Sequence, residues 1–295
     1  MKKYEKWREL LTDPYYISFK NLKLKEIINY LPAGNDVLEC LFEFQNRKQK
    51  LFLKIERSKV VDFETEVKNL NILHNEYHYN NISRVIEDGY TNDKKYIVLE
   101  KMNGERLSEI ISKGISDETK KEYLIKYGKE LAKIHKLSPD LFTKSKQRII
   151  NSIPMLNTYN EFDPVIQKYI NYLNDNSFDI KLETFIHGDF HYANILWDNE
   201  EISAILDWEY SGLGLKEQDI AWACVLRPTQ KFLTTTTEIK ELIEGYKSET
   251  EFDFNKFKWC LINAYCHFYL MNQENNEYTS VLINNLKEII LWEEI

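Results

Sequence analysis

The sequence predicts an α+β protein with two lobes: a small lobe built on a five-stranded antiparallel sheet with one helix, and a larger, mainly helical lobe. Two observations support this prediction. Before residue 102 the apolar residues form short runs rich in branched and aromatic side chains, which favours strands. After residue 103 they recur mostly at helical spacing. A chain of 295 residues is long enough to bury two cores, so we expect lobes at residues 1–102 and 103–295.

The expected elements of the small lobe alternate with polar turns. A short helix is predicted at residues 4–11, before a turn at Asp13-Pro14. The main helix of this lobe has Phe63, Val67 and Leu70 on one side, which is typical of a helix packed on a sheet. The predicted strands cover residues 26–31, 37–44, 51–55, 84–90 and 95–101, and this helix covers residues 63–74.

Helical spacing dominates the larger lobe. Two short apolar runs at 195–197 and 202–206 interrupt it, and the polar turn between them predicts a β-hairpin. A basic and less regular stretch at 141–154 is expected to be a loop. The predicted helices cover residues 107–111, 119–137, 164–174, 218–226, 238–247, 254–269 and 279–292.

The composition excludes several classes of protein. A formal net charge of −8 disfavours a nucleic-acid partner, which would require a basic surface. The N-terminus lacks the apolar stretch of a signal peptide, and no segment is long enough to span a membrane, so we expect a cytoplasmic protein without a membrane partner. The four cysteines stand singly in apolar segments, which predicts buried free thiols.

The most informative segment is residues 186–209, IHGDFHYANILWDNEEISAILDWE. Asp189 precedes Asn194 by five positions, and Asp207 follows the second strand of the predicted hairpin. Phosphoryl transfer needs these groups: a carboxylate that orients an acceptor hydroxyl, then an amide and a carboxylate that hold Mg²⁺. We therefore interpret Asp189 as the catalytic residue and Asn194 and Asp207 as metal ligands.

This segment resembles the catalytic and metal loops of the aminoglycoside phosphotransferase and choline kinase-like family, whose members are relatives of the protein kinases. The resemblance extends in element order over about residues 25–270 and implies a protein kinase-like fold. It also implies that Lys54, on the third strand, pairs with a carboxylate on the following helix to hold the nucleotide. Glu64 and Glu66 are both candidates, and Glu66 better matches the family's acidic position. Taken alone, Lys54 could instead be an edge residue whose ammonium group reaches water.

Two further segments match nucleotide-binding positions of the family. The turn between the first two strands falls where the kinase-like fold covers the phosphates, so backbone groups near Gly34 and Asn35 are candidate ligands; an ordinary hairpin loop is the alternative. Residues 96–104 resemble the hinge that binds the adenine edge. By position, Glu100 and Met102 would offer the backbone groups, although an edge strand ending at a turn has the same pattern.

Several residues near the motif have open or supporting roles. His187 is expected to fix the catalytic loop by packing and hydrogen bonding, whereas the role of His191 stays open. Asp219 begins a predicted helix, where the helix dipole favours a negative charge; the resemblance implies that it also tethers the catalytic-loop backbone. His135 matches a family position and is expected to pack in the core.

The resemblance implies a Mg²⁺-dependent enzyme that moves the γ-phosphoryl group of ATP or GTP to a hydroxyl group of a small molecule. We expect an aminoglycoside-type antibiotic as acceptor, with choline, ethanolamine or homoserine as the alternative; a cationic acceptor would suit the acidic chain.

A Ser/Thr protein kinase is disfavoured because no activation segment follows Asp207 and HGD replaces HRD. A catalytically inactive nucleotide-binding module would have lost at least one of Lys54, Asp189, Asn194 and Asp207, and none is lost. No obligate protein partner is implied.

Overall fold

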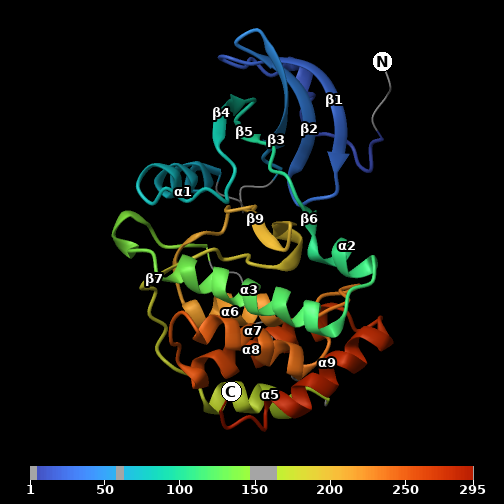
Figure 1. Ribbon diagram of the computed structural model, residues 1–295, viewed down its shortest axis with the longest axis vertical. Helices are drawn as coiled ribbons and strands as arrows, with labels where there is room; N and C mark the ends of the chain where they lie inside the picture. The colour runs from blue at the N-terminus through green and yellow to red at the C-terminus, as the bar shows by residue number, and fades with distance from the viewer. Residues whose placement is uncertain (1–4, 58–62, 147–164, 295) are drawn as a thin grey trace. The chain divides into compact units, whose positions relative to one another are not determined.

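The computed structural model of the protein describes residues 5–57, 63–146 and 165–294 (Figure 1). The chain divides into two compact units. The first unit comprises Met1–Asn103 and Ala204–Tyr210, and the second comprises Gly104–Ser203 and Ser211–Ile295. Within the described residues, no helix combines the length and the apolar character that a membrane span requires.

The first unit contains the predicted five-stranded antiparallel sheet, with strand order β1-β2-β3-β5-β4 (Figure 1). Two of its hairpins turn at residue pairs with positive φ, Gln45-Asn46 and Asn92-Asp93, a geometry that matches the twist of the flanking strands. Helix α1 packs on the sheet side through Phe63, Leu70 and other buried residues. The elements are β1 (Lys23–Leu31), β2 (Asp36–Phe44), β3 (Arg47–Ile55), α1 (Phe63–Asn75), β4 (Val85–Thr91) and β5 (Lys94–Glu100).

The N-terminal helix predicted at residues 4–11 is wrong for the residues that the structure describes, since residues 5–11 form no regular element. Here Trp7 Nε1 donates a hydrogen bond to the carbonyl of Leu31 at 3.0 Å, and Arg8 Nε donates to the hydroxyl of Tyr30 at 2.9 Å. Neighbouring residues of a helix point in different directions, so a helix would not keep both side chains on one edge of the sheet. These contacts to β1 replace helical structure.

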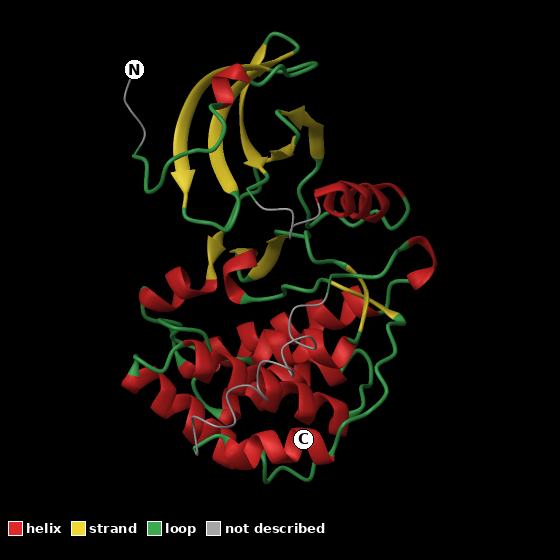
Figure 2. Cartoon of the chain, turned by 180° about the vertical axis from the view of Figure 1, so that it is seen from behind, coloured by secondary structure: helices red, strands yellow, loops and turns green. Residues whose placement is uncertain are grey.

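The second unit is mainly helical, as predicted, and its helices lie together in Figure 2. Helix α8 has a continuous buried stretch: every residue from Phe257 to Cys266 is buried, and the helix contacts α5, α6 and α9. The helices that the structure describes in this unit are α2 (Leu107–Ser112), α3 (Asp117–His135), α5 (Gln167–Asp175), α6 (Lys216–Cys224), α7 (Thr236–Lys247), α8 (Phe254–Met271) and α9 (Asn276–Ile289). Of the loop predicted at 141–154, residues 147–154 lie outside the described part of the chain.

Helices α3 and α7 cross at two glycines. A Cβ atom on Gly128 would lie 2.0 Å from the carbonyl oxygen of Leu242, and one on Gly245 would lie 2.0 Å from that of Ile125. Any larger side chain would force the helices apart, so these glycines set the distance between α3 and α7. The helices in turn support the loop that follows β7, because α3 contacts that strand.

Short strands frame the predicted catalytic segment. The predicted hairpin is confirmed as β8 (Ile195–Asp198) and β9 (Glu201–Ile205), and its turn residues Asn199 and Glu200 both have positive φ. Strand β6 (Glu105–Arg106) pairs with β8. Strand β7 (Thr184–Ile186) pairs with β10 (Gly212–Gly214) and leads directly into His187. Strands β7 and β10 have three residues each and are too short to show a periodic pattern in the sequence.

Candidate active site

Lys54 lies between three carboxylates of the first unit, of which those of Glu66 and Glu209 are buried. Its ammonium nitrogen donates to both carboxylate oxygens of Glu66, at 2.9 and 2.7 Å, and to Oδ1 of Asp207 at 2.7 Å. Oε2 of Glu209 lies 3.5 Å away. Lys54 is 6% exposed and Glu66 is fully buried. The ion pair implied by the family resemblance is therefore present, and Lys54 is not an edge residue that reaches water.

The charges of this group fix the state of Lys54. Burial alone would lower the pKa of Lys54, but the negative charges of Asp207, Glu66 and Glu209 raise it well above its usual range. Burial raises the pKa of Glu66, while the charge of Lys54 opposes that rise. With three carboxylates around one ammonium, the lysine is charged and the group carries excess negative charge, which can attract a cation.

Asp207 reaches Lys54 from an unusual backbone position. It follows β9 with a φ of 65°, a left-handed conformation that aspartate tolerates better than most residues. Two hydrogen bonds support this turn: Ile205 N donates to Asn81 O at 2.7 Å, and Trp208 Nε1 donates to Ile205 O at 2.9 Å. Such strain persists only where the surroundings impose it, and it is often found at functional sites.

The turn between β1 and β2 is held by side chains. Asn35 is buried; its amide donates to Oε2 of Glu209 at 2.9 Å, and its oxygen accepts from the backbone N–H of Arg57 at 3.3 Å. Arg8 donates to the carbonyls of Gly34 and Asn35, at 3.0 and 2.6 Å. The sequence drew attention to the backbone of this turn, but in the structure the Asn35 side chain connects it to the carboxylate group around Lys54.

The predicted hinge residues lie at the end of β5. Glu100 pairs with Leu51 of β3, and its backbone N–H donates to the carbonyl of Arg84 at 2.9 Å. Met102 follows two residues later and is partly buried. Their contact with a nucleotide base stays a prediction.

In the second unit, strand β7 leads into the predicted catalytic loop. Gly188 has a φ of 78°, which suits glycine at this sharp turn. The backbone N–H groups of His187 and Gly188 donate to Asp219, at 2.8 and 3.0 Å, and Asp189 N–H donates to Nδ1 of His187 at 3.2 Å. The predicted roles of Asp219 as a tether and of His187 as a loop-fixing residue are therefore confirmed.

The tether is anchored in the helices. Nε2 of His135 on α3 lies 3.2 Å from Oδ2 of Asp219, and its Nδ1 lies 2.8 Å from the hydroxyl of Tyr246 on α7. All three side chains are buried. His135 therefore does more than pack in the core, because it connects the loop tether to the crossing of α3 and α7.

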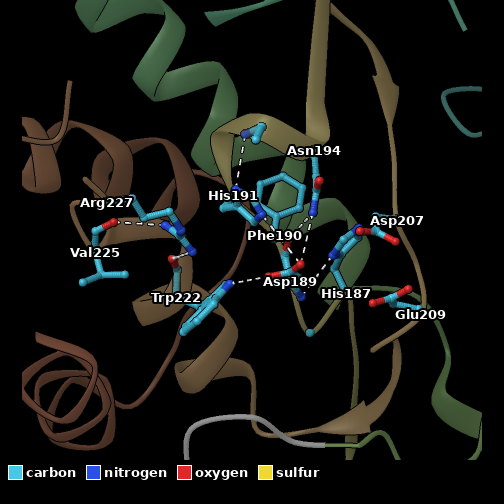
Figure 3. A network of polar contacts seen from close by, with 12 residues as sticks. His187, Asp189, Phe190, His191, Asn194, Asp207, Glu209, Trp222, Val225 and Arg227 are labelled. Carbon is cyan, nitrogen blue, oxygen red and sulfur yellow. Dashed lines mark hydrogen bonds and ion pairs between the residues drawn. The ribbon is translucent and has the colours of Figure 1, made fainter. Parts of the chain in front are cut away.

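The carboxylate of Asp189 is held on both oxygens (Figure 3). The side-chain amide of Asn194 lies 3.0 Å from the backbone carbonyl of Asp189 and 3.3 Å from its Oδ2. The indole N–H of Trp222 donates to Oδ1 at 2.8 Å. Nε2 of His191 lies 3.6 Å from Oδ2, and its Nδ1 accepts from the backbone N–H of Ala193. Asp189 is only 4% exposed, so its orientation is set by these groups.

Comparison with known proteins identifies the type of molecule. The model of the phosphotransferase enzyme family matches residues 28–258, which is most of the chain and includes Lys54, Glu66, Asp189, Asn194 and Asp207. The chain belongs to the phosphotransferase enzyme family. The predicted enzyme class, a small-molecule phosphotransferase, and the predicted family are therefore confirmed.

Several solved structures have the same fold as this chain. A thermostable mutant of aminoglycoside phosphotransferase APH(4)-Ia, in a ternary complex with ADP and hygromycin B, aligns with a TM-score of 0.61 and 13% identity over 90% of this chain and 94% of that chain. Choline kinase LicA from Streptococcus pneumoniae aligns with a TM-score of 0.54 and 14% identity over 91% and 92%. A putative fructosamine-3-kinase from Haemophilus somnus 129PT aligns with a TM-score of 0.53 and 15% identity over 92% of both chains. The predicted kinase-like fold is confirmed. A search of curated proteins finds no match.

In this phosphotransferase the predicted site residues fall into two sets. Lys54 contacts both Glu66 and Asp207 in the first unit, and Asp189 and Asn194 contact one another in the second. The ligand oxygens of Glu66, Asp207 and Glu209 lie within 4.8 Å of one another, a spacing that a metal ion could bridge. Because Glu66 already accepts two hydrogen bonds from Lys54, Asp207 and Glu209 are the better candidates in this group.

Two residues of this phosphotransferase were missed in the sequence. Glu209 was not among the predicted nucleotide or metal residues, yet its buried carboxylate joins the Lys54 group. Trp222 occurs in the apolar pattern of a helix, where an indole is usually a packing residue. Both need the folded chain to bring them to their partners, so only the position of Glu209 two residues after Asp207 offered a signal.

Proposed function

We propose that this protein transfers the γ-phosphoryl group of ATP or GTP to a hydroxyl group of a small molecule. The observation that carries the proposal is the buried ion pair of Lys54 with Glu66, in which the ammonium group also binds the half-buried Asp207, because kinase-like sites use such a lysine to hold nucleotide phosphates. Gly34, Asn35, Glu100 and Met102 complete the proposed nucleotide site.

Asp189 is the proposed catalytic residue. Its carboxylate accepts a hydrogen bond from the acceptor hydroxyl, whose oxygen attacks the γ-phosphorus while the bond from that phosphorus to the β–γ bridging oxygen breaks. The hydroxyl proton passes to Asp189 as the new oxygen–phosphorus bond forms. Charge develops mostly on the phosphoryl oxygens, so orientation by Asp189 and charge stabilisation by Lys54 supply most of the rate increase.

Asn194 and Asp207 are the proposed ligands of Mg²⁺. Carboxylate and amide oxygens are the donors that a hard divalent cation prefers, and the side chain of Asp207 is 35% exposed, which leaves it accessible. When bound, the cation neutralises charge on the nucleotide phosphates. The excess of carboxylates around Lys54 supports the presence of a cation in the active enzyme.

An aminoglycoside-type antibiotic is the proposed acceptor. Two facts support it: the net charge of −8 suits a polycationic sugar, and the fold neighbour APH(4)-Ia binds hygromycin B. The alternative is a metabolite such as choline, ethanolamine or homoserine, since another fold neighbour is a choline kinase. A Ser/Thr protein kinase and a catalytically inactive binding module are the less favoured hypotheses.

Release of ADP from Mg-ATP, measured against hygromycin B, other aminoglycosides, macrolides, choline, ethanolamine and homoserine, tests the proposal. We expect acceptor-dependent turnover that Asp189→Ala abolishes, that Asp179→Ala (an exposed aspartate of the same unit) leaves unchanged, and that EDTA removes until Mg²⁺ is restored. Phosphorus NMR of the product identifies the phosphorylated hydroxyl. Nucleotide binding with no turnover on the panel or on water would contradict the proposal.

A further inference from the structure

Trp222, on helix α6, donates its indole N–H to the carboxylate of the proposed catalytic residue (Figure 3). The distance from Nε1 to Oδ1 of Asp189 is 2.8 Å, and both side chains are buried. We propose that Trp222 is a positioning residue for phosphoryl transfer, which fixes the rotamer of Asp189 so that its carboxylate meets the acceptor hydroxyl. This inference rests on the proposed function.

The geometry explains why an indole is needed at this position. Asp189 turns about two side-chain bonds, and a carboxylate with one fixed oxygen can still rotate. Trp222 holds Oδ1, while the amide of Asn194 lies close to Oδ2 and to the backbone carbonyl of the same residue. With both oxygens restrained, the plane of the carboxylate is fixed. A hydrogen bond to a charged and buried group is also stronger than one to a neutral group.

Trp222 is itself held in place from two sides. The guanidinium of Arg227 lies 4.8 Å from the centre of the indole ring and donates to the backbone carbonyl of Trp222 at 2.9 Å. The ring of Phe268, on α8, packs at 5.4 Å. Arg227 also donates to the carbonyl of Val225, so it cannot leave the indole without losing two hydrogen bonds. Because the indole is fixed against α6 and α8, its N–H group can hold the Asp189 side chain in one orientation.

The hydrogen bond of Trp222 could serve only to satisfy a buried indole N–H group, and Trp259 is the matched comparison for that alternative. It is buried in the same unit and donates to the backbone carbonyl of Leu173 at 2.8 Å. Both indoles are buried, 8% and 3% exposed, and donate at the same distance, but Trp222 donates to Asp189 and Trp259 to a backbone carbonyl. A purely structural role predicts the same result when either N–H is removed, whereas a positioning role predicts loss of catalysis at Trp222 alone.

The test replaces each tryptophan in turn by 3-benzothienylalanine, which keeps the ring shape but has sulfur in place of N–H. At position 222 we expect kcat with the most active panel acceptor, or with water, to fall about 10- to 100-fold, with KM for Mg-ATP within about two-fold of wild type. At position 259 we expect kcat to stay within about two-fold of wild type. The simpler variant Trp222→Phe should behave like the first analogue.

A spectroscopic measurement tests the contact without turnover. In protein carrying ¹⁵N-labelled indoles, the resonance assigned by its absence in Trp222→Phe should shift and exchange faster in Asp189→Ala, while that of Trp259 stays in place. Wild-type kcat with the analogue at position 222, or an unshifted resonance, would overturn the role of Trp222. Failure of wild type to turn over any acceptor or water would contradict the proposed function instead.

Discussion

The ammonium nitrogen of Lys54 lies 2.7 Å from Oε2 of Glu66, and both side chains are buried in the first unit. β3 supplies the lysine and α1 supplies the glutamate, so the pair joins the sheet to its helix. The same ammonium also holds Asp207, which makes it both a structural and a proposed catalytic group. The charge of Lys54 is therefore expected to matter for folding as well as for turnover.

Replacement of Lys54 by methionine should remove turnover and destabilise the protein. Loss of one partner of a buried ion pair typically costs about 3–5 kcal/mol, because the remaining charges are left unpaired. Without Lys54, the pKa of Glu66, already raised by burial, should rise further. An acid whose pKa is higher in the folded than in the unfolded protein lowers the free energy of unfolding as the pH rises. The variant should therefore be less stable at about pH 8 than at about pH 5. Urea unfolding at both values measures this difference.

Lys95 provides the matched control. It is a buried lysine on the neighbouring strand β5, but its partners Glu64 and Asp88 have side chains that are 65% and 36% exposed. Water can solvate these carboxylates after Lys95→Met, so we expect a loss of about 1 kcal/mol and turnover close to wild type. Equal stability losses for the two variants at both pH values would contradict the special role of Lys54.

Asn35 should control nucleotide affinity through Glu209. Asn35→Ala removes the donor to Glu209 and the acceptor for Arg57 N–H, at an expected cost of about 1–3 kcal/mol and with a raised KM for Mg-ATP. Asn35→Asp should be worse, because it sets a carboxylate against that of Glu209. Melting temperature and KM measure both effects, with Asn29→Ala, exposed on the same hairpin, as the control. If Asn35→Asp bound nucleotide as tightly as wild type, the link to Glu209 would have no function.

Local signals account for the parts of the fold that the sequence predicted well. The strands of the first unit and helices such as α7 and α8 follow periodic apolar patterns, and the β8–β9 hairpin has a polar turn of suitable length. The N-terminal segment failed because contacts of Trp7 and Arg8 to β1 outweigh a weak helical pattern. Strand β10 was not predicted because its three residues are too few to show a periodic pattern.

The candidate site divides in the same way. Lys54 and Glu66 could be paired because the family resemblance supplies a contact that no spacing in one sequence reveals. Trp222 lies 33 residues from Asp189, and Asn35 lies 174 residues from Glu209. Contacts over such separations depend on how elements pack, and a single sequence without aligned relatives does not record them. The contacts of Trp222 with Asp189 and of the Asn35 side chain with Glu209 were therefore not predicted.

Asp219 should be essential for holding the catalytic loop. Its two oxygens accept from the backbone N–H groups of His187 and Gly188, so Asp219→Asn would turn an amide N–H₂ toward one of these donors. We expect a loss of about 1–3 kcal/mol and a fall of about 100-fold in kcat, because Asp189 is displaced. Glu217→Gln, on the same helix, keeps an acceptor for Asp253 N–H and should retain wild-type kcat. A folded Asp219→Asn variant with wild-type kcat would show that the tether is dispensable.

The crossing of α3 and α7 should tolerate no side chain at Gly245. Alanine is favoured over glycine within a helix by about 1 kcal/mol, so a free helix position would gain stability from Gly245→Ala. Here the new methyl group would lie 2.0 Å from the carbonyl oxygen of Ile125, and separation of the helices should cost about 1–3 kcal/mol overall. Because Tyr246 and His135 connect this crossing to Asp219, kcat should fall together with the melting temperature. Glu122→Ala, exposed on α3, controls for the substitution itself and should change stability by less than about 0.5 kcal/mol. A Gly245→Ala variant that melts at or above the wild-type temperature would mean that the helices can separate without cost.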